Sequence, residues 1–210
     1  MTSSEIFLYQ GDLPEGLSLG PVVAIDTESM GLNPLRDRLC VVQLSSGDGK
    51  AHLVQLKAGH YEAPHLRKML SDPSVTKLFH FARADLAMLS AYLGAVAGPV
   101  YCTKIASLLA RTFTDKHSLK DLTRDLLGVT LIKEQQTSDW GADTLSEEQK
   151  IYAASDVLYL HALREKLDAM LVREMRSGLA QAAFAFLPAR AALDLAGWSG
   201  VDIFAHRPSR

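Results

Sequence analysis

Cysteine is scarce in this chain, and the two residues present exclude several kinds of architecture. Cys40 and Cys102 each lie within an apolar run and form no paired-cysteine motif. This usage favours two reduced core thiols in a cytosolic protein over a disulfide framework. Zinc-type Cys/His clusters, glycine-rich phosphate loops and Ser/His/Asp arrangements are not evident either.

The chain also lacks a strong charge of one sign and a long hydrophobic run. Its formal net charge is −2, whereas proteins that coat long nucleic acids usually need a broad positive face. Any nucleic-acid substrate is therefore expected to be short or held by a local basic cluster. No apolar run approaches the roughly 20 residues that span a bilayer, and residues 1–13 lack the basic and apolar regions of a signal peptide. We expect a soluble, cytoplasmic protein without membrane contact.

The 210 residues fit a single α/β domain, and 48% hydrophobic with 22% charged residues indicates a globular chain. Closely spaced strands come first and indicate an antiparallel meander, and strands alternating with helices follow and indicate parallel strands. We expect one domain over residues 1–210, a mixed sheet flanked by helices, with a helical and apolar C-terminal extension from about residue 175. The expected strands are 6–9, 22–28, 39–45, 51–56, 75–81 and 100–102. The expected helices are 64–70, 82–92, one from the Ser118 cap to the Gly128 stop, 146–173, and 178–187 with its end at Pro188.

Two acidic residues close the first strong strand. Asp26 and Glu28 are two apart, so they share one face of the strand with the apolar residues before them. Carboxylates so placed repel each other, and a hard divalent cation with oxygen ligands would offset that repulsion. Taken alone, the pair is more often a solvated acidic pair at a strand end.

Further acidic residues lie in apolar surroundings later in the chain. Asp85 stands where a strand gives way to an apolar helix. Asp156 lies inside a helix, although aspartate is a poor residue for a helix interior. Tyr152 and Asp156 are i and i+4, hence on one face of that helix. Each residue singly fits a surface acid, a buried acceptor or a core-edge aromatic; together they supply four acids and a phenol.

These residues carry a family resemblance that covers almost the whole chain. Asp26-Thr27-Glu28, Asp85 and the Tyr152-x-x-x-Asp156 pattern resemble, in order, the three motifs of the DEDD 3′→5′ exonucleases, tyrosine branch. Residues 80–85 and 138–140 are similar to ribonuclease D, residues 30–34 to a loop of oligoribonucleases, and residues 36–44 and 197–204 to the nanoRNase C family. Phe81 departs from the superfamily, whose polymerase proofreading domains often carry asparagine there. The histidine branch is a poorer match, because Ile151 occupies its catalytic position.

The resemblance implies a ribonuclease H-like exonuclease fold and a catalytic centre with two divalent ions, Mg²⁺ or Mn²⁺. Asp26, Glu28, Asp85 and Asp156 are then the metal ligands. Tyr152 would orient the attacking water, since a phenol with a pKa of about 10 is a poor general base. The implied reaction releases nucleoside 5′-monophosphates from very short RNA, including dinucleotides, and the nanoRNase C likeness implies a homo-oligomer, an octamer in that family.

Several residues are candidates for holding the substrate. The resemblance to oligoribonucleases gives Leu32 the role of a wedge between two bases. Lys104 and Arg111, in the basic segment after Cys102, are candidate phosphate contacts, although such a charge run is usually a solvated helix face. His80 could contact a phosphate or be a structural histidine, and Trp140 could stack on a base, although packing is the commoner role of such an aromatic.

Three functions stay open on the sequence alone. The first is degradation of very short RNA, favoured by the near-neutral charge, the Leu32 loop and the lack of an accessory binding domain. The second is trimming of longer RNA, as in ribonuclease D, or digestion of DNA. The third is a non-catalytic nucleic-acid-binding protein, which the complete set of acids argues against. The apolar residues after about 175 are expected to pack on the domain or fill a subunit interface.

Overall fold

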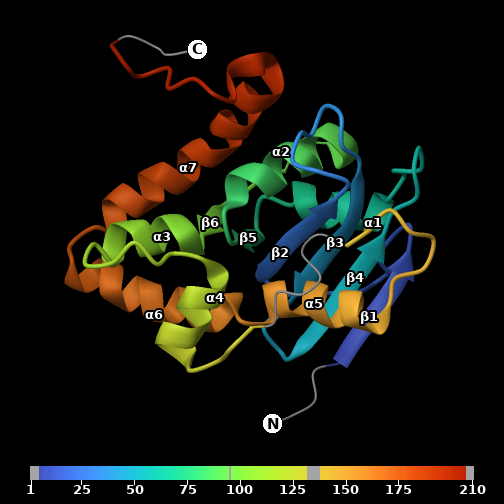
Figure 1. Cartoon of the computed structure of the whole chain (residues 1–210), viewed down its shortest axis with the longest axis horizontal. Helices are drawn as coiled ribbons and strands as arrows, with labels where there is room; N and C mark the ends of the chain where they lie inside the picture. The colour runs from blue at the N-terminus through green and yellow to red at the C-terminus, as the bar shows by residue number, and fades with distance from the viewer. Residues whose placement is uncertain (1–4, 95, 132–137, 207–210) are drawn as a thin grey trace.

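The computed structural model describes residues 5–94, 96–131 and 138–206. Within these residues, six strands form one mixed sheet in the order β1-β4-β3-β2-β5-β6 (Figure 1). The β2–β3 and β3–β4 pairs are antiparallel, and the β2–β5 and β5–β6 pairs are parallel, as the sequence predicts. The opening strand adds a parallel pair with β4 at one edge. The strands are β1 (Glu5–Gln10), β2 (Val22–Ser29), β3 (Leu39–Ser45), β4 (Lys50–Gln55), β5 (Thr76–Phe79) and β6 (Val100–Cys102).

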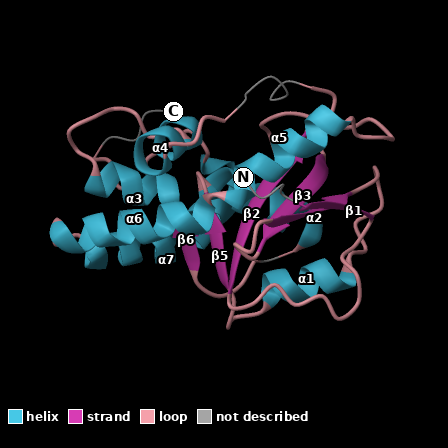
Figure 2. Ribbon diagram, turned by 90° about the horizontal axis from the view of Figure 1, so that it is seen from below, coloured by secondary structure: helices cyan, strands magenta, loops and turns pink. Residues whose placement is uncertain are grey.

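Helices cover both faces of this sheet and extend beyond its β6 edge. Helix α5 crosses one face, α1 and α2 lie on the other, and α3, α6 and α7 pack together next to β6 (Figure 2). Ser118 and Ser146 cap their helices as expected, and Ser146 forms a full capping box with Gln149. The helices are α1 (Pro64–Ser71), α2 (Ala82–Leu93), α3 (Thr103–Ala110), α4 (Leu119–Leu122), α5 (Glu147–Leu158), α6 (Leu160–Arg173) and α7 (Ser177–Leu193), with π-helical segments η1 (Thr123–Leu127) and η2 (Asp194–Trp198).

The core positions the carboxyl end of β2. Strand β3 is buried along its whole length, because β2 and β4 flank it and helices cover both of its faces. In β2, residues 23–25 are buried, whereas the last four residues are polar and only half-buried. The strand therefore carries Asp26 and Glu28 from the core to the edge of a cleft.

The long helix expected from Ser146 to Arg173 is in fact two helices. Tyr159 has φ −105° and ψ −5°, and this separates α5 from α6. The break allows α5 to lie across the sheet while α6 packs against α3. No proline or glycine marks the position, so the sequence contains no ordinary signal for it.

The helix expected to end at Pro188 continues through it to Leu193. An interior proline costs a helix about 3 kcal/mol, but Leu187 and Ala191 on either side are buried and hold the helix in place. The continuous run Ser177–Trp198 is long and apolar enough, by length and composition alone, to cross a membrane, so the expectation of no such run is wrong. Only 22% of the window that meets this criterion is buried, although α7 packs against α2, α3 and β6.

Candidate active site

Three carboxylates from two elements meet at the carboxyl end of β2. Asp26 and Glu28 extend from β2, and Asp156 extends from α5, which crosses that strand. One carboxylate oxygen from each residue lies within 4.8 Å of the other two. The spacing of Asp26 and Glu28 on one strand face produces the pair, and the helix crossing adds the third acid.

Asp85 joins this group from the first turn of α2. Its side chain is buried, and the Thr27 hydroxyl donates a 2.8 Å hydrogen bond to its Oδ1 atom. Asp85 lines the same cavity as Asp26, Glu28 and Asp156. All four acids identified in the sequence therefore face one site, with Asp85 slightly apart from the close trio.

Burial and mutual repulsion disfavour the charged forms of these acids. Burial raises the pKa of Asp26 to about 7. Burial, followed by the charges of Asp26, Asp156 and Asp85, raises the pKa of Glu28 to about 10. Burial and the charge of Asp26 also raise the pKa of Asp85 well above its usual value. Such shifts mark a site where a positive charge is needed to keep the carboxylates ionised.

The donor set fits a hard divalent cation. Every close donor in the trio is a carboxylate oxygen, which is the ligand type that Mg²⁺ and Mn²⁺ prefer. The lysines that line this cavity among the described residues are Lys104 and Lys120, and neither forms an ion pair with these acids. Neither of these two lysines therefore offsets the charge of the acids.

A pH-dependent loss of stability follows for the metal-free protein. The folded-state pKa of Glu28 lies above its unfolded value, so the folded chain holds a proton that the unfolded chain releases from about pH 4.5 upward. Stability should then decline as pH rises from about 4.5 towards 10. In EDTA at pH 8, Glu28→Gln is expected to raise the stability by about 1 kcal/mol or more, or about 2–4 °C in Tm.

Thermal melts of the two proteins in EDTA between pH 5 and 9 check this expectation. The gap between Glu28→Gln and the unmodified protein should widen with pH, and Mg²⁺ should stabilise the unmodified protein at pH 8. A gap that is constant across the pH range would contradict the assignment of Glu28 as a repelled acid.

Tyr152 lies next to the acids on α5, one turn before Asp156. Its side chain is half-buried and lines the cavity. Burial, together with the charge of Asp156, raises the pKa of Tyr152 above its usual value. The phenol therefore stays protonated at neutral pH and is available as a hydrogen-bond donor, not as a base.

The rim of the cavity contains the side chains that could meet a substrate. The cavity has a volume of about 380 Å³. Leu32 lies on its rim and is 98% exposed, which is unusual for a leucine beside a core. His80 also lines it, with Nδ1 2.8 Å from the Thr103 hydroxyl oxygen. The ammonium of Lys104 lies 4.3 Å from the centre of the Phe81 ring.

Two candidate substrate contacts lie elsewhere, which contradicts the direct roles expected for them. Arg111 is buried and pairs with Asp125 at 2.7 Å, so its guanidinium does not face the cavity. Trp140 is buried in a small core cluster, with its ring centre 6.0 Å from that of Tyr152. Trp140 thus supports Tyr152 from behind, which is the packing role that the sequence also allowed.

Three further residues lie at the site without having been assigned a role from the sequence. Gln43 is fully buried opposite Asp26, and its amide nitrogen lies 3.5 Å from Asp26 Oδ2. Lys120 lines the cavity, although in the sequence it is one of several lysines in a segment expected to be a solvated helix face. Phe81 has φ 65°, a left-handed conformation that asparagine tolerates and a bulky residue rarely adopts. Phe81 is therefore strained beside the cavity.

Comparisons with known proteins agree with this arrangement. The 3′–5′ exonuclease family matches residues 11–172. Ribonuclease D of Acidiphilium cryptum is 35% identical over 164 residues, which are 78% of this chain and 41% of that protein. The chain thus spans about two fifths of the length of the curated relatives it matches.

Two solved structures of NrnC from Brucella melitensis resemble the whole chain. NrnC bound to pGG is 53% identical, with a TM-score of 0.94, and the match covers 98% of this chain and 100% of that one. NrnC with bound Mg²⁺ is 52% identical, with a TM-score of 0.92 and coverage of 97% and 100%. From its acids, its fold and these matches, the chain belongs to the DEDD superfamily of 3′–5′ exonucleases, in the ribonuclease D-like group.

Proposed function

We propose that this protein is a two-metal-ion 3′→5′ exoribonuclease that degrades very short RNA, including dinucleotides, to nucleoside 5′-monophosphates. The observation that carries the proposal is the meeting of Asp26, Glu28 and Asp156 within 4.8 Å, at a cavity that Asp85 also lines. The whole-chain likeness to NrnC, which was solved with pGG and with Mg²⁺, supports both the substrate class and the metal.

In this proposal each residue at the site has a distinct task. Asp26, Glu28 and Asp156 would hold one cation, and Asp85 would help to hold a second. Such a pair of ions lowers the pKa of a bound water and stabilises the attacking and leaving oxygens. Tyr152 donates a hydrogen bond that orients the attacking water. Gln43 donates to Asp26 and helps to fix the rotation of its carboxylate.

A time course on 5′-labelled RNAs from two to about twenty nucleotides, with Mg²⁺ or Mn²⁺, tests the proposal. The expected result is the highest kcat/KM on the dinucleotide. Faster removal of nucleotides from the long RNA would instead support the ribonuclease D-like alternative, and faster digestion of the matching DNA would support a DNA exonuclease. Absence of any metal-dependent cleavage would leave the non-catalytic alternative.

Leu32 is the residue through which we expect short substrates to be selected. Its exposed side chain stands at the rim of the cavity, where it can insert between the two bases of a bound dinucleotide. Leu32→Ala should raise the KM for a dinucleotide by about tenfold, because wedging or stacking against a base is worth about 1–3 kcal/mol. Leu179→Ala, an equally conservative change on an exposed leucine of α7 away from the cavity, is the control. An unchanged KM in Leu32→Ala would contradict the wedge.

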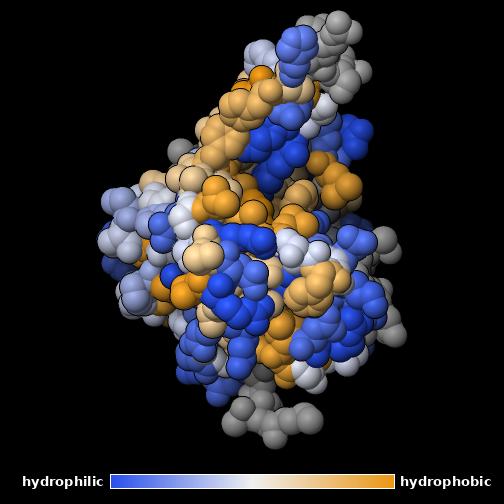
Figure 3. All heavy atoms as spheres, turned by 90° about the vertical axis from the view of Figure 1, so that its left-hand side faces the viewer, coloured by the Kyte–Doolittle hydropathy of each residue, from blue (hydrophilic) through white to orange (hydrophobic). Residues whose placement is uncertain are grey.

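Self-association is a further part of the proposal. The end of α7 and the segment after it project from the body (Figure 1), and Figure 3 shows apolar residues along this projection. Trp198, Ile203 and Phe204 are all exposed there, and such a surface is typical of a covered interface. We expect light scattering to give a mass several times the 22.9 kDa of one chain. A monomeric mass at micromolar concentration would contradict it.

A further inference from the structure

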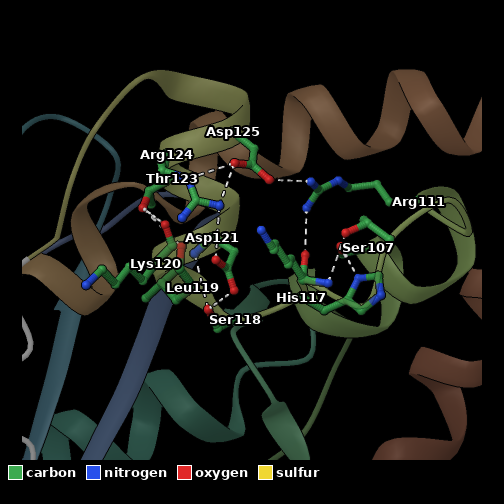
Figure 4. A network of polar contacts seen from close by, with 12 residues as sticks. Ser107, Arg111, His117, Ser118, Leu119, Lys120, Asp121, Thr123, Arg124 and Asp125 are labelled. Atoms are coloured by element: carbon green, nitrogen blue, oxygen red, sulfur yellow. Dashed lines mark hydrogen bonds and ion pairs between the residues drawn. The ribbon is translucent and has the colours of Figure 1, made fainter.

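A network of ion pairs next to the cleft is the starting point. Arg111 pairs with Asp125, and Arg124 pairs with both Asp125 and Asp121 (Figure 4). Asp121 in turn accepts a short hydrogen bond from the Ser118 hydroxyl. The chain of contacts therefore runs from the end of α3 to the first residue of the segment that lines the cavity.

This segment has little stability of its own. Helix α4 is four residues long and passes directly into the π-helical segment η1. A helix this short is unstable by itself, because its few hydrogen bonds do not offset the entropy lost when the first turn is fixed. Its position must therefore be set by contacts with the rest of the chain.

Arg111 supplies two of those contacts from a buried position. It follows the last residue of α3, and its side chain is 4% exposed. One terminal nitrogen donates to the Lys116 carbonyl at 3.0 Å, and the other pairs with Asp125 at 2.7 Å. The guanidinium thus joins the start and the end of residues 116–125 to a packed helix. Its planar fork suits two such contacts better than a lysine would.

Lys120 is the cation that this arrangement places at the cavity. It lines the cavity together with the acids, and its side chain extends away from the network (Figure 4). The ion pairs of this segment go to Arg111 and Arg124, and none in the described part of the chain involves Lys120. The other cavity lysine, Lys104, already lies over the Phe81 ring.

We propose that the Lys120 ammonium contacts a phosphate oxygen of the bound RNA, and that Arg111 is a positioning residue that holds Lys120 there through Asp125 and the Lys116 carbonyl. Two divalent cations at most balance the charge of four carboxylates, so a lysine on the same cavity adds attraction for a phosphate. This inference rests on the proposed function, because it assumes an RNA substrate in the cavity.

The test uses a 5′-phosphorylated RNA dinucleotide and two readouts. Calorimetric titration in Ca²⁺ gives Kd without relying on turnover, and initial rates in Mg²⁺ give kcat and KM. Lys120→Met should weaken Kd and raise KM about tenfold, as expected for a lost charge-assisted contact, while kcat changes less than about threefold. The slope of log Kd against log salt concentration should decrease by about 1 in this variant, as expected for the loss of one phosphate contact. Lys120→Arg should restore most of the binding, and Lys166→Met, an exposed lysine of α6, should change neither readout.

Double variants test whether Arg111 acts through Lys120. Arg111→Met should raise KM as Lys120→Met does, and the double variant should be no worse than either single one. Asp125→Asn provides the same test with a milder change, because Asp125 is partly exposed and the amide keeps its shape. Added to the Lys120→Met variant, Asp125→Asn should raise KM by less than twofold. In the otherwise unmodified protein, Asp125→Asn should raise KM clearly.

The outcomes separate this inference from the proposed function. Normal Kd and KM in Lys120→Met would overturn the role of Lys120, and multiplicative effects in the Lys120/Asp125 double variant would overturn the positioning role. Dinucleotide binding that depends on Lys120 without any turnover would uphold the inference and refute the proposed activity. A protein that binds no dinucleotide at all would overturn both.

Discussion

Asp26→Asn is expected to lower turnover of an RNA dinucleotide by at least about 10³-fold in Mg²⁺ or Mn²⁺. Asp26 is the acid that meets both Glu28 and Asp156 and whose charge also acts on Asp85. In the proposed arrangement it would be a ligand of the metal centre, and metal ions supply several kcal/mol of transition-state stabilisation, with a factor of ten for each 1.36 kcal/mol. Asparagine keeps the shape of the side chain, so the fold should persist while metal binding is lost.

Initial rates together with calorimetric titration of Mn²⁺ measure this effect. Glu165→Gln neutralises an exposed acid of α6 that does not line the cavity, and it should leave both quantities unchanged. If Asp26→Asn kept more than about a tenth of the activity, the carboxylate cluster would not be the catalytic centre.

Tyr152→Phe is expected to lower kcat by about 10²-fold with little change in KM. The change removes one hydroxyl and keeps the ring that packs against Trp140. Positioned proton donors and acceptors typically contribute 10²–10⁴-fold, and a residue that only orients water falls at the low end of that range. Manganese affinity should be unaffected, because the phenol is not among the ligands.

The pH dependence separates an orienting tyrosine from a basic one. Burial and Asp156 raise the pKa of Tyr152 above its usual value, so the hydroxyl keeps its proton from pH 6 to 9. The shape of the rate profile over this range should therefore be the same in the unmodified protein and in Tyr152→Phe. Tyr159→Phe, at the junction of α5 and α6 and outside the cavity lining, is the matched control. A rise in rate with pH that disappears only in Tyr152→Phe would instead show that Tyr152 acts as a base.

Much of the fold could be predicted because its signals are local. Turn residues bound the strands, and β-branched residues fill them, so the meander and the later parallel strands were placed correctly. The acids could also be found, because a carboxylate in an apolar stretch is unusual enough to notice at Asp85 and Asp156. Their convergence depended on the family resemblance as much as on residue chemistry, since no local rule states which helix crosses β2.

The predictions that were wrong concern residues whose conformation or partners depend on contacts with residues distant in the sequence. From the sequence, Arg111 could be a solvated or a substrate-binding arginine. In the structure its guanidinium donates hydrogen bonds to Asp125 and the Lys116 carbonyl, and these contacts form only when the chain folds. The break at Tyr159 and the continuation of α7 through Pro188 likewise follow from tertiary packing, which overrides local propensity. The left-handed backbone of Phe81 could not be read from the residue type, because a phenylalanine rarely adopts it and it occurs here at the turn from β5 into α2.

The pairing of β1 with β4 has a consequence for how the chain is made. Among the described strands, β1 leaves the ribosome before the others, but its partner is complete only when Gln55 has been translated. The antiparallel β2–β3–β4 unit can assemble as it emerges, and the N-terminal strand must then join from outside. Asp156 is translated much later still, so a nascent chain carries most of its sheet long before it has a complete cation site.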